Sequence, residues 1–340
     1  MHLTLDPVDT LMFRDGRPFE QTDAGASEAL SVFPPWPPTL VGAIRAALWD
    51  SLGAWDKARL GDGTDWQKPG TLGPLCFGPP VLVWKGEAVF AAPLHLIEGR
   101  KDEQPQLAFL RPGKERECDL GKVRLPEPAT GGISGIKPVS DRWITKAGMA
   151  RVLKGKLPDR EHLLPLSELW RDEARVGIGI DPASRTTSDG RLYLARHVRP
   201  GADLRLHMTV KGWNGAFPPS PRPLGGEHRM ASIGPGEPPD LPSGQPGDRL
   251  CLIAISPVVP EQDGRIEGLS PDNIVSACLG KPLPIGGWDS VNRRSIPMRN
   301  CYPAGSVWFV EGLEPVPPKI GAATKWGFGR VLAGVWPSGT

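Results

Sequence analysis

The 340-residue sequence lacks the features that mark several large protein classes. Its five cysteines are scattered and odd in number, and none forms a Cys-x-x-Cys pair, so we expect neither a disulfide framework nor a cysteine zinc site. No apolar run approaches the ~18 residues that a membrane span requires. Residues 1–11 contain neither the basic nor the apolar region of a signal peptide. We therefore expect a protein of the reducing cytoplasm that has no membrane partner.

The common catalytic motifs are also missing. The sequence contains no Gly-x-Ser-x-Gly, no Walker-type Gly-Lys-Ser/Thr and no His-x-x-x-His. We expect no metal site and no cofactor, and the residues do not indicate an enzyme. If the chain were instead a metal-independent ribonuclease, His197 and His207 would be the best candidates for its general base, because both lie in basic segments. Their simpler interpretation is that of ordinary core or surface histidines.

Positive charge is small in total but unevenly distributed. The net charge of +2 is too low to predict tight nucleic-acid binding from bulk electrostatics. Residues 136–160, however, carry seven basic and two acidic side chains, and residues 191–211 carry five and one. Residues 319–330 carry Lys319, Lys325 and Arg330 without any acid. These segments could together form a surface that faces a polyanion.

The 42 glycines and 40 prolines indicate a folded chain with many turns, and the spacing of apolar residues predicts an α+β protein of two domains. Thr39 is expected to cap a helix over 39–50, whose first turn either is satisfied by that cap or binds a phosphate. Ser270 is expected to begin another helix, which ends at Gly280. The polar, Gly/Pro-rich regions 98–135 and 212–248 are expected to be long loops. The other expected elements are a strand over 2–11, a hairpin over 81–90, a basic helix over 145–154, and strands over 175–180, 191–198, 202–210, 250–255 and 307–310.

An ordered series of motifs resembles one family of CRISPR proteins, the RAMP subunit that caps the crRNA in the type III-B Cmr effector complex. Each motif is modest alone, but their order and spacing extend over nearly the whole chain. The matching segments are Asp9–Phe19, Pro34–Arg45, Glu173–Ile178 with Asp181 and Arg185, Gly190–Tyr193, Leu224–Arg229, Pro284–Asp289, Pro303–Phe309 and Gly327–Gly329.

The resemblance implies two ferredoxin-like (RRM-like) domains of the RAMP type. We place the first over residues 1–200, with a thumb-like insertion within about 98–160, and the second over 201–340, with a glycine-rich loop at 327–334. The resemblance also implies a subunit that is not itself a nuclease. Such a subunit holds the 5′ handle of the crRNA and contacts the large polymerase/cyclase-like subunit and the backbone RAMP subunit.

Fourteen residues are candidates for RNA contact. Arg14, Arg17 and Arg45 could anchor phosphates near the first expected helix, although Arg14 and Arg17 could equally pair with Asp9, Asp15 or Glu20. Lys137, Arg142 and Lys146 are expected to contact RNA from the thumb. The arginines of the central matched motifs could bind RNA or brace the fold by ion pairs. These arginines are Arg175, Arg185, Arg191 and Arg229. The C-terminal loop contributes the last four candidates, Lys325, Gly327, Gly329 and Arg330.

Two other functions stay open at this stage. The first is a metal-independent RAMP-type endoribonuclease that processes precursor crRNA with a histidine base. The second is an unrelated β-rich domain that binds a small ligand, which would make the motif series a coincidence. RAMP-type domains in the structure would count against the second.

Overall fold

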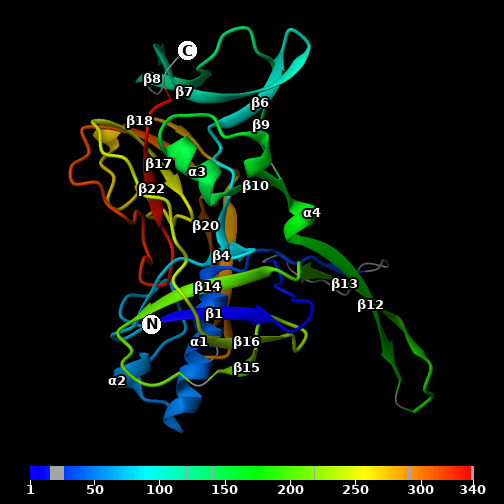
Figure 1. Ribbon diagram of the computed structural model, residues 1–340. Coiled ribbons are helices and arrows are strands. Elements are labelled where there is room, and N and C mark those ends of the chain that lie inside the picture. The colour runs from blue at the N-terminus through cyan, green and yellow to red at the C-terminus, as the bar shows by residue number, and fades with distance from the viewer. Residues whose placement is uncertain are drawn as a thin grey trace.

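Antiparallel sheets dominate the computed structural model, and few helices accompany them (Figure 1). The expected α+β architecture is therefore mostly β. No helix in the described ranges is long and apolar enough to cross a membrane. The structure describes residues 1–15, 27–119, 121–139, 141–181, 183–217, 219–289 and 292–337.

The largest sheet has nine strands in the order β11-β10-β5-β4-β14-β1-β16-β15, with β3 paired to β14. Strand β1 lies in its interior, where Leu3 is opposite Met208 of β14 and Pro235 of β16. Since β1 and β4 each pair antiparallel with β14, they run parallel to one another. The strands are β1 (His2–Pro7), β3 (Cys76–Phe77), β4 (Val81–Trp84), β5 (Glu87–Ala91), β10 (Arg142–Thr145), β11 (Leu163–Pro165), β14 (Leu204–Lys211), β15 (Ser220–Pro223) and β16 (Met230–Pro235).

Helix α1 (Pro37–Leu52) packs on this sheet with the apolar residues that predicted it, among them Leu40, Ile44 and Leu48. It begins at Pro37 rather than after Thr39, and its N-cap residue Trp36 makes no side-chain capping bond. Two prolines in the first turn have the required φ and carry no N–H, so fewer orphan donors remain. The expectation that Thr39 caps this helix is therefore wrong, and the start of α1 has little to offer a phosphate.

A second sheet is built in the same way. Strands β17 (Arg249–Ala254), β18 (Ile274–Cys278), β21 (Val307–Glu311) and β22 (Val331–Val335) have the order β18-β21-β17-β22. The central four strands of the first sheet have the order β4-β14-β1-β16, which is the same arrangement. In each sheet the strand that comes first in sequence (β1 or β17) lies between the third and the fourth of the set, and the second (β4 or β18) lies beside the third. The expected helix from Ser270 is instead a 3-10 turn, Pro271–Asn273, followed by β18.

Helix α3 (Lys146–Leu153) joins the two sheets. As predicted, it is short and basic, and Thr145 caps it through a bond from the Gly148 N–H to Oγ1 (3.2 Å). Its buried residues Met149 and Val152 share a core with Cys251 of β17 and with residues of β5. The helix therefore covers a face of the second sheet although it comes from the first half of the chain.

Residues 98–135 form strands rather than the expected loop. Strands β6 (Leu96–Lys101), β7 (Gln104–Cys118), β8 (Gly121–Pro128) and β9 (Ser134–Pro138) make an antiparallel sheet at the top of Figure 1. The distal parts of β7 and β8 are exposed on both faces, so they carry no apolar alternation to predict them. Cross-strand ion pairs join them instead, such as Arg116 with Glu127 (2.9 Å).

A long hairpin, the arm, projects from the body at the lower right of Figure 1. It consists of β12 (Trp170–Ile180) and β13 (Thr187–Pro200), with β2 (Ser27–Ala29) parallel to β13. The short helix α4 (Leu166–Leu169) leads into it. Both strands were predicted, but shorter than observed. The thumb-like insertion was expected within about 98–160, whereas the hairpin that projects farthest lies outside that range.

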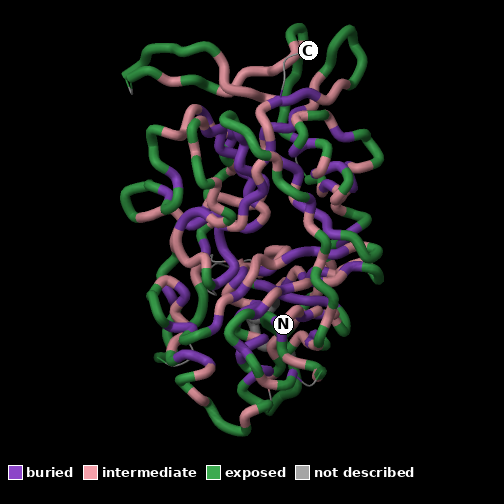
Figure 2. The backbone as a smooth tube through the Cα atoms, turned by 60° about the vertical axis from the view of Figure 1, so that its left-hand side comes forward, coloured by how far each residue is buried: buried purple, intermediate pink, exposed green. Residues whose placement is uncertain are grey.

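The division expected between residues 200 and 201 cuts through the first sheet, because β14 and β16 follow it in sequence and pair with β1. A later hairpin, β19 (Leu283–Asp289) with β20 (Arg294–Cys301), also returns to the first core, where Ile285 and Ile296 are buried. The indole of Trp66, beyond helix α2 (Lys57–Leu60), donates to the carbonyl of Gly286 (2.8 Å). Figure 2 shows buried segments running through both halves while the outer hairpins are exposed.

Candidate nucleic-acid interface

Four cations gather where the segment 319–330 meets strands β3 and β14. Lys319 and Arg330 are opposite one another in an antiparallel bridge, and Lys211 is opposite Cys76 at the end of β14. Lys325 lies in the turn between them, and its carbonyl accepts a bond from the Phe77 N–H (2.7 Å). In the described part of the chain, none of the four cations forms an ion pair with a carboxylate. We call Lys211, Lys319, Lys325 and Arg330 the cation cluster.

The charges of the cation cluster destabilise one another. Burial, and then the nearby charges of Arg330 and Lys211, lower the pKa of Lys319, although the Cys76 thiol acts in the opposite direction. Burial also lowers the pKa of Arg330. The Lys319 ammonium donates to the carbonyl of Thr324 (2.9 Å), which holds it in place without neutralising it. An anion bound here would relieve both the desolvation cost and the repulsion.

The glycines of this segment serve backbone packing. Gly327 and Gly329 have φ of 94° and 73°, and both are buried. A Cβ on Gly327 would lie 2.5 Å from the carbonyl oxygen of Gly78, and one on Gly329 would lie 2.0 Å from that of Ile320. The predicted loop at 327–334 is only partly a loop, because β22 begins at Val331. The glycines thus hold the backbone that carries the cations, and they face protein backbone.

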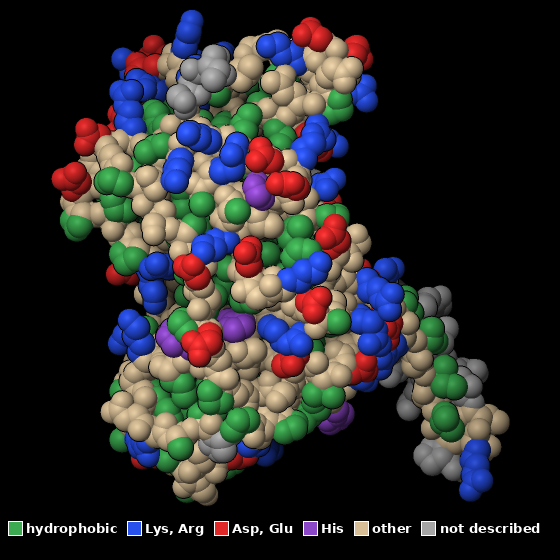
Figure 3. All heavy atoms as spheres, in the orientation of Figure 1, with side chains coloured by type: hydrophobic (Ala, Val, Ile, Leu, Met, Phe, Trp, Pro, Cys, Tyr) green, Lys and Arg blue, Asp and Glu red, His purple; other side chains and the backbone are tan. Residues whose placement is uncertain are grey.

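A second group of charges, the arm base, lies where β12 and β13 join the body. Glu173 accepts bonds from Arg199 (2.5 Å) and Arg175 (2.9 Å), and Asp9 accepts from Arg199 (2.9 Å) and Arg175 (3.3 Å). Arg229 lies 3.6 Å from Asp9. The bonds from Arg199 and then Arg175 lower the pKa of Glu173 to about 2. In Figure 3, blue and red side chains are interleaved over this part of the molecule.

The two groups differ in how well their charge is balanced. At the arm base two carboxylates face three guanidiniums: Arg175 pairs with Glu173 and Asp9, and Arg229 lies near Asp9. The cation cluster has no such balance in the described residues. Its positive charge is therefore less compensated than that of the arm base, and it attracts a polyanion more strongly.

The family model described as "CRISPR-associated protein (Cas_Cmr3)" matches residues 3–336. The chain belongs to this Cmr3 family. No curated protein matches the sequence significantly.

Two solved structures share the fold of this Cmr3-family chain. One is described as "Cryo-EM structure of the Type III-B Cmr-beta bound to cognate target RNA", with a TM-score of 0.55 and 18% identity over 91% of this chain and 86% of that one. The other, the same complex with target RNA and AMPPnP in state 1, gives a TM-score of 0.56 and 17% identity over the same shares. The chain is thus similar in fold to a subunit of a type III-B Cmr complex.

Arg45, which was expected to anchor phosphate, is a brace inside the Cmr3-family fold. It is 2% exposed, and its guanidinium donates to the carbonyls of Leu60 (3.0 and 2.7 Å) and Gly63 (2.6 Å). Burial lowers its pKa to about 10, so the side chain remains charged at neutral pH. The Trp55 ring lies 5.1 Å from the guanidinium carbon. The arginine joins α1 to the following loop and is not accessible to RNA.

The remaining predicted RNA contacts do not converge on one surface. Lys137 on β9 pairs with Glu98 (3.1 Å), and Lys146 on α3 pairs with Asp240. Arg142 is exposed on β10, and Arg185 is exposed in the turn at the end of the arm. Arg14 is exposed at an isolated bridge with Ser31. Arg17 lies outside the described residues, as does the side chain of Arg191.

The residues that sequence reasoning missed are Lys211, Lys319, Arg199 and Asp9. Lys319 was noted only as part of a basic segment, and Lys211 was separated from that segment by more than a hundred positions. The one available signal for the arm base was the run Glu173-Ala-Arg175, which places opposite charges on the same face of a strand. Nothing local connects that run with Asp9.

Of the two histidines considered as general bases, His197 is buried and His207 is half-buried. His197 is 2% exposed, and its Nδ1 lies 3.1 Å from the Thr10 hydroxyl oxygen. Burial, and then the charges of Arg175 and Arg229, lower the pKa of His197. Burial also lowers the pKa of His207, whose Nδ1 is enclosed without a hydrogen-bond partner in the described residues.

Proposed function

We propose that this Cmr3-family chain is a non-catalytic, cytoplasmic RNA-binding scaffold of a type III-B CRISPR effector complex. In this proposal it caps the 5′ handle of the crRNA and bridges the large polymerase/cyclase-like subunit and the backbone RAMP subunit. The observation that carries the proposal is the cation cluster: Lys319 and Arg330 are half-buried, Lys211 and Lys325 are exposed, and none of the four has a carboxylate partner in the described part of the chain. Phosphate oxygens are the anions that such a complex would supply.

The proposal includes two ferredoxin-like domains of the RAMP type. The strand order that the two sheets share supports it, since a split β-α-β unit with a fourth strand beside the first defines that topology. The first sheet has its helix α1, and the second is covered by α3 from outside its own strands. The proposal also assigns the thumb-like role to the arm, whose strand β12 exposes Val176, Ile178 and Ile180 along one face.

The test uses the complex reconstituted with its other subunits and a crRNA. We expect Lys319→Gln/Arg330→Gln to weaken RNA binding and to flatten the slope of log K against log salt by about 0.7 per lost phosphate contact. The matched control is Lys122→Gln, which removes an exposed lysine that is paired with Glu115 (3.0 Å). Crosslinks from the cluster to the 5′ end of the crRNA would support the proposal. An unchanged slope would overturn it.

The non-catalytic part of the proposal has its own test. The isolated chain should not cleave precursor crRNA in the presence of a chelator, because His197 is buried and the Nδ1 atom of His207 is enclosed. Cleavage that His197→Ala or His207→Ala abolishes would instead establish the metal-independent endoribonuclease.

A further inference from the structure

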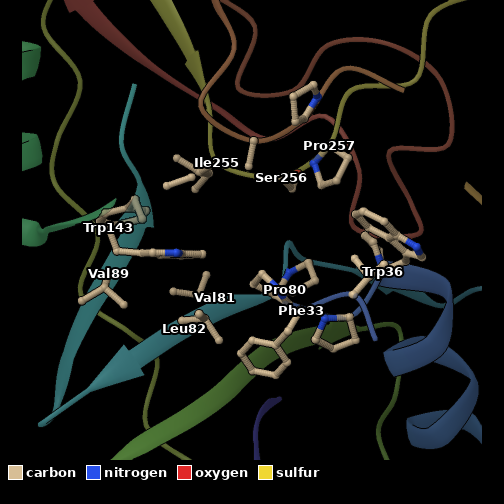
Figure 4. A pocket seen from close by; sticks show the side chains of 18 of the residues that line it. Phe33, Trp36, Pro80, Val81, Leu82, Val89, Trp143, Ile255, Ser256 and Pro257 are labelled. Atoms are coloured by element: carbon tan, nitrogen blue, oxygen red, sulfur yellow. The ribbon is translucent and has the colours of Figure 1, made fainter. Parts of the chain in front are cut away.

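An apolar cavity of about 280 Å³ lies between the first sheet, the start of α1 and the second half of the chain. Figure 4 shows Trp143 and Trp36 on opposite sides of it, with Pro80 and Phe33 below and Ser256 above. Its wall contains no charged side chain among the described residues. The site therefore suits a neutral, flat and largely apolar group.

The volume of the cavity and its single side-chain hydroxyl limit which ligands can bind. Ligand pockets usually enclose about 300–1,000 Å³, so this cavity has room for one ring system and not for a charged tail. Ser256 is the one side-chain hydroxyl among the residues that line it. Its Oγ accepts a bond from the Arg330 N–H (3.0 Å), so the hydroxyl proton can still be donated to an acceptor on the edge of a ring. Flat rings with such acceptors include the nucleobases.

Hydrogen bonds join the wall of the cavity to the segment that carries the cation cluster. Besides the bond to Ser256, Arg330 accepts from the Ile255 N–H (2.9 Å), and Gly329 donates to the carbonyl of Pro257 (2.8 Å). A second link runs through β3: Cys76 is paired with Lys211 of the cation cluster, and Pro80 lines the cavity. Pro80 follows Cys76 by four residues, which span at most ~14 Å of extended chain. A nucleic acid whose phosphates lie on the cluster would therefore have bases within reach of the cavity.

We propose that the cavity binds one unpaired nucleobase of the RNA whose phosphates contact the cation cluster. This inference rests on the proposed function and adds a base-binding site to it. Trp36 and Trp143 would supply stacking surfaces, since stacking on aromatic rings is how proteins hold unpaired bases. An apolar side chain of a partner protein fits the wall equally well, but it would leave the neighbouring cations without an anion.

The experiment uses crRNA probes in which 2-aminopurine replaces successive bases of the 5′ region, bound to the reconstituted complex. Stacking quenches this fluorophore, so one position should be quenched more than the others. Ala304→Phe fills the cavity from its wall, and Trp36→Ala removes one of its rings. We expect both variants to relieve quenching at that position and to weaken RNA binding at least fivefold. The matched control is Ala58→Phe, which adds the same ring at an exposed position of α2.

The outcomes separate this inference from the proposed function. Probes that bind the wild-type complex, with equal quenching in wild type and in Ala304→Phe, would overturn the base-binding site while the proposed function stands. Loss of a protein subunit from the Ala304→Phe complex, with quenching unchanged, would also overturn it and assign the cavity to a partner side chain. Probes that fail to contact the wild-type chain at all would overturn the proposed function and the inference together.

Discussion

Arg199 on β13 donates from Nε to Oε2 of Glu173 on β12 over 2.5 Å, across the base of the arm. Arg175 and Asp9 extend this pair into a network that reaches the start of the chain. A two-stranded hairpin is marginally stable alone, and the described apolar side chains Val176, Ile178 and Ile180 of β12 are exposed. The network therefore determines how firmly the arm is held against the body.

Glu173→Gln should loosen the arm. The variant keeps the shape of the side chain but removes the charge that balances Arg175 and Arg199. We expect faster amide hydrogen exchange in β12 and β13 with little change in the midpoint of global unfolding, because the pair is partly solvent-exposed. Glu115→Gln, which breaks an ion pair of the β7–β8 hairpin, is the control and should leave exchange in the arm unchanged.

Acid should loosen the arm in the wild-type protein as well. The folded-state pKa of Glu173 is about 2, below its ordinary value of 4.5, so ion pairing adds stability that is complete above about pH 4.5. That stability is lost as the pH falls through the window from 4.5 to about 2. Hydrogen exchange in the arm, followed against pH, should rise in this window, and the rise should be smaller in Glu173→Gln.

His95 should make the whole fold acid-sensitive. The ring is completely buried, stacks on Phe109 with centroids 5.0 Å apart, and has no hydrogen-bond partner on either nitrogen in the described residues. Burial lowers its pKa from 6.5 to about 3, so the unfolded chain binds the proton first as the pH falls. The free energy of unfolding should fall by about 1.4 kcal/mol per pH unit between about pH 6 and 3 on account of this residue.

Chemical denaturation from pH 7 to pH 4 measures that dependence. His95→Phe keeps the stacking and removes the titration, so its stability should depend less on pH than that of the wild type. The exposed His228→Asn is the control and should follow the wild-type curve. Equal slopes for wild type and His95→Phe would contradict the prediction.

Gly329→Ala should destabilise the chain by at least about 2 kcal/mol, because the backbone has φ of 73° and a Cβ would lie 2.0 Å from the carbonyl oxygen of Ile320. Gly42→Ala, in the middle of α1 with nothing within 4 Å of its would-be Cβ, should stabilise it by about 0.5–1 kcal/mol. Thermal unfolding of both variants tests the pair. A tolerated Gly329→Ala would mean that this turn is not the rigid support of Arg330.

Removal of the apolar face of the arm should affect RNA contact more than folding. Val176 and Ile178 are 68% and 50% exposed, so Val176→Ser/Ile178→Ser should change the free energy of unfolding by less than about 0.5 kcal/mol each. In the reconstituted complex we expect crosslinks between the arm and RNA to be lost while those at Arg330 remain. Retained crosslinks at the arm would contradict the thumb-like role.

Periodicity predicted the elements that bury one face. The alternation of Leu204, Leu206 and Met208 predicted β14, and the helical spacing of Leu40, Ile44 and Leu48 predicted α1, because each pattern records contact with a core. The distal parts of strands β7 and β8 are exposed on both faces, so their sequences show no apolar alternation. The helix expected after Ser270 failed because pairing with β21 outweighed a favourable start signal.

The amino-acid sequence by itself determined the family, the main secondary-structure elements of both cores and the basic character of the segment around Lys325 and Arg330. These depend on residue type and on spacing along the chain. Only the tertiary structure decided which cations are buried or paired with carboxylates: Arg45 is buried among carbonyls and Arg175 lies between carboxylates, while Lys211 joins Lys319 and Arg330 in the cation cluster. The free energy of a charge depends on its burial and on neighbours that the fold brings together from distant parts of the chain.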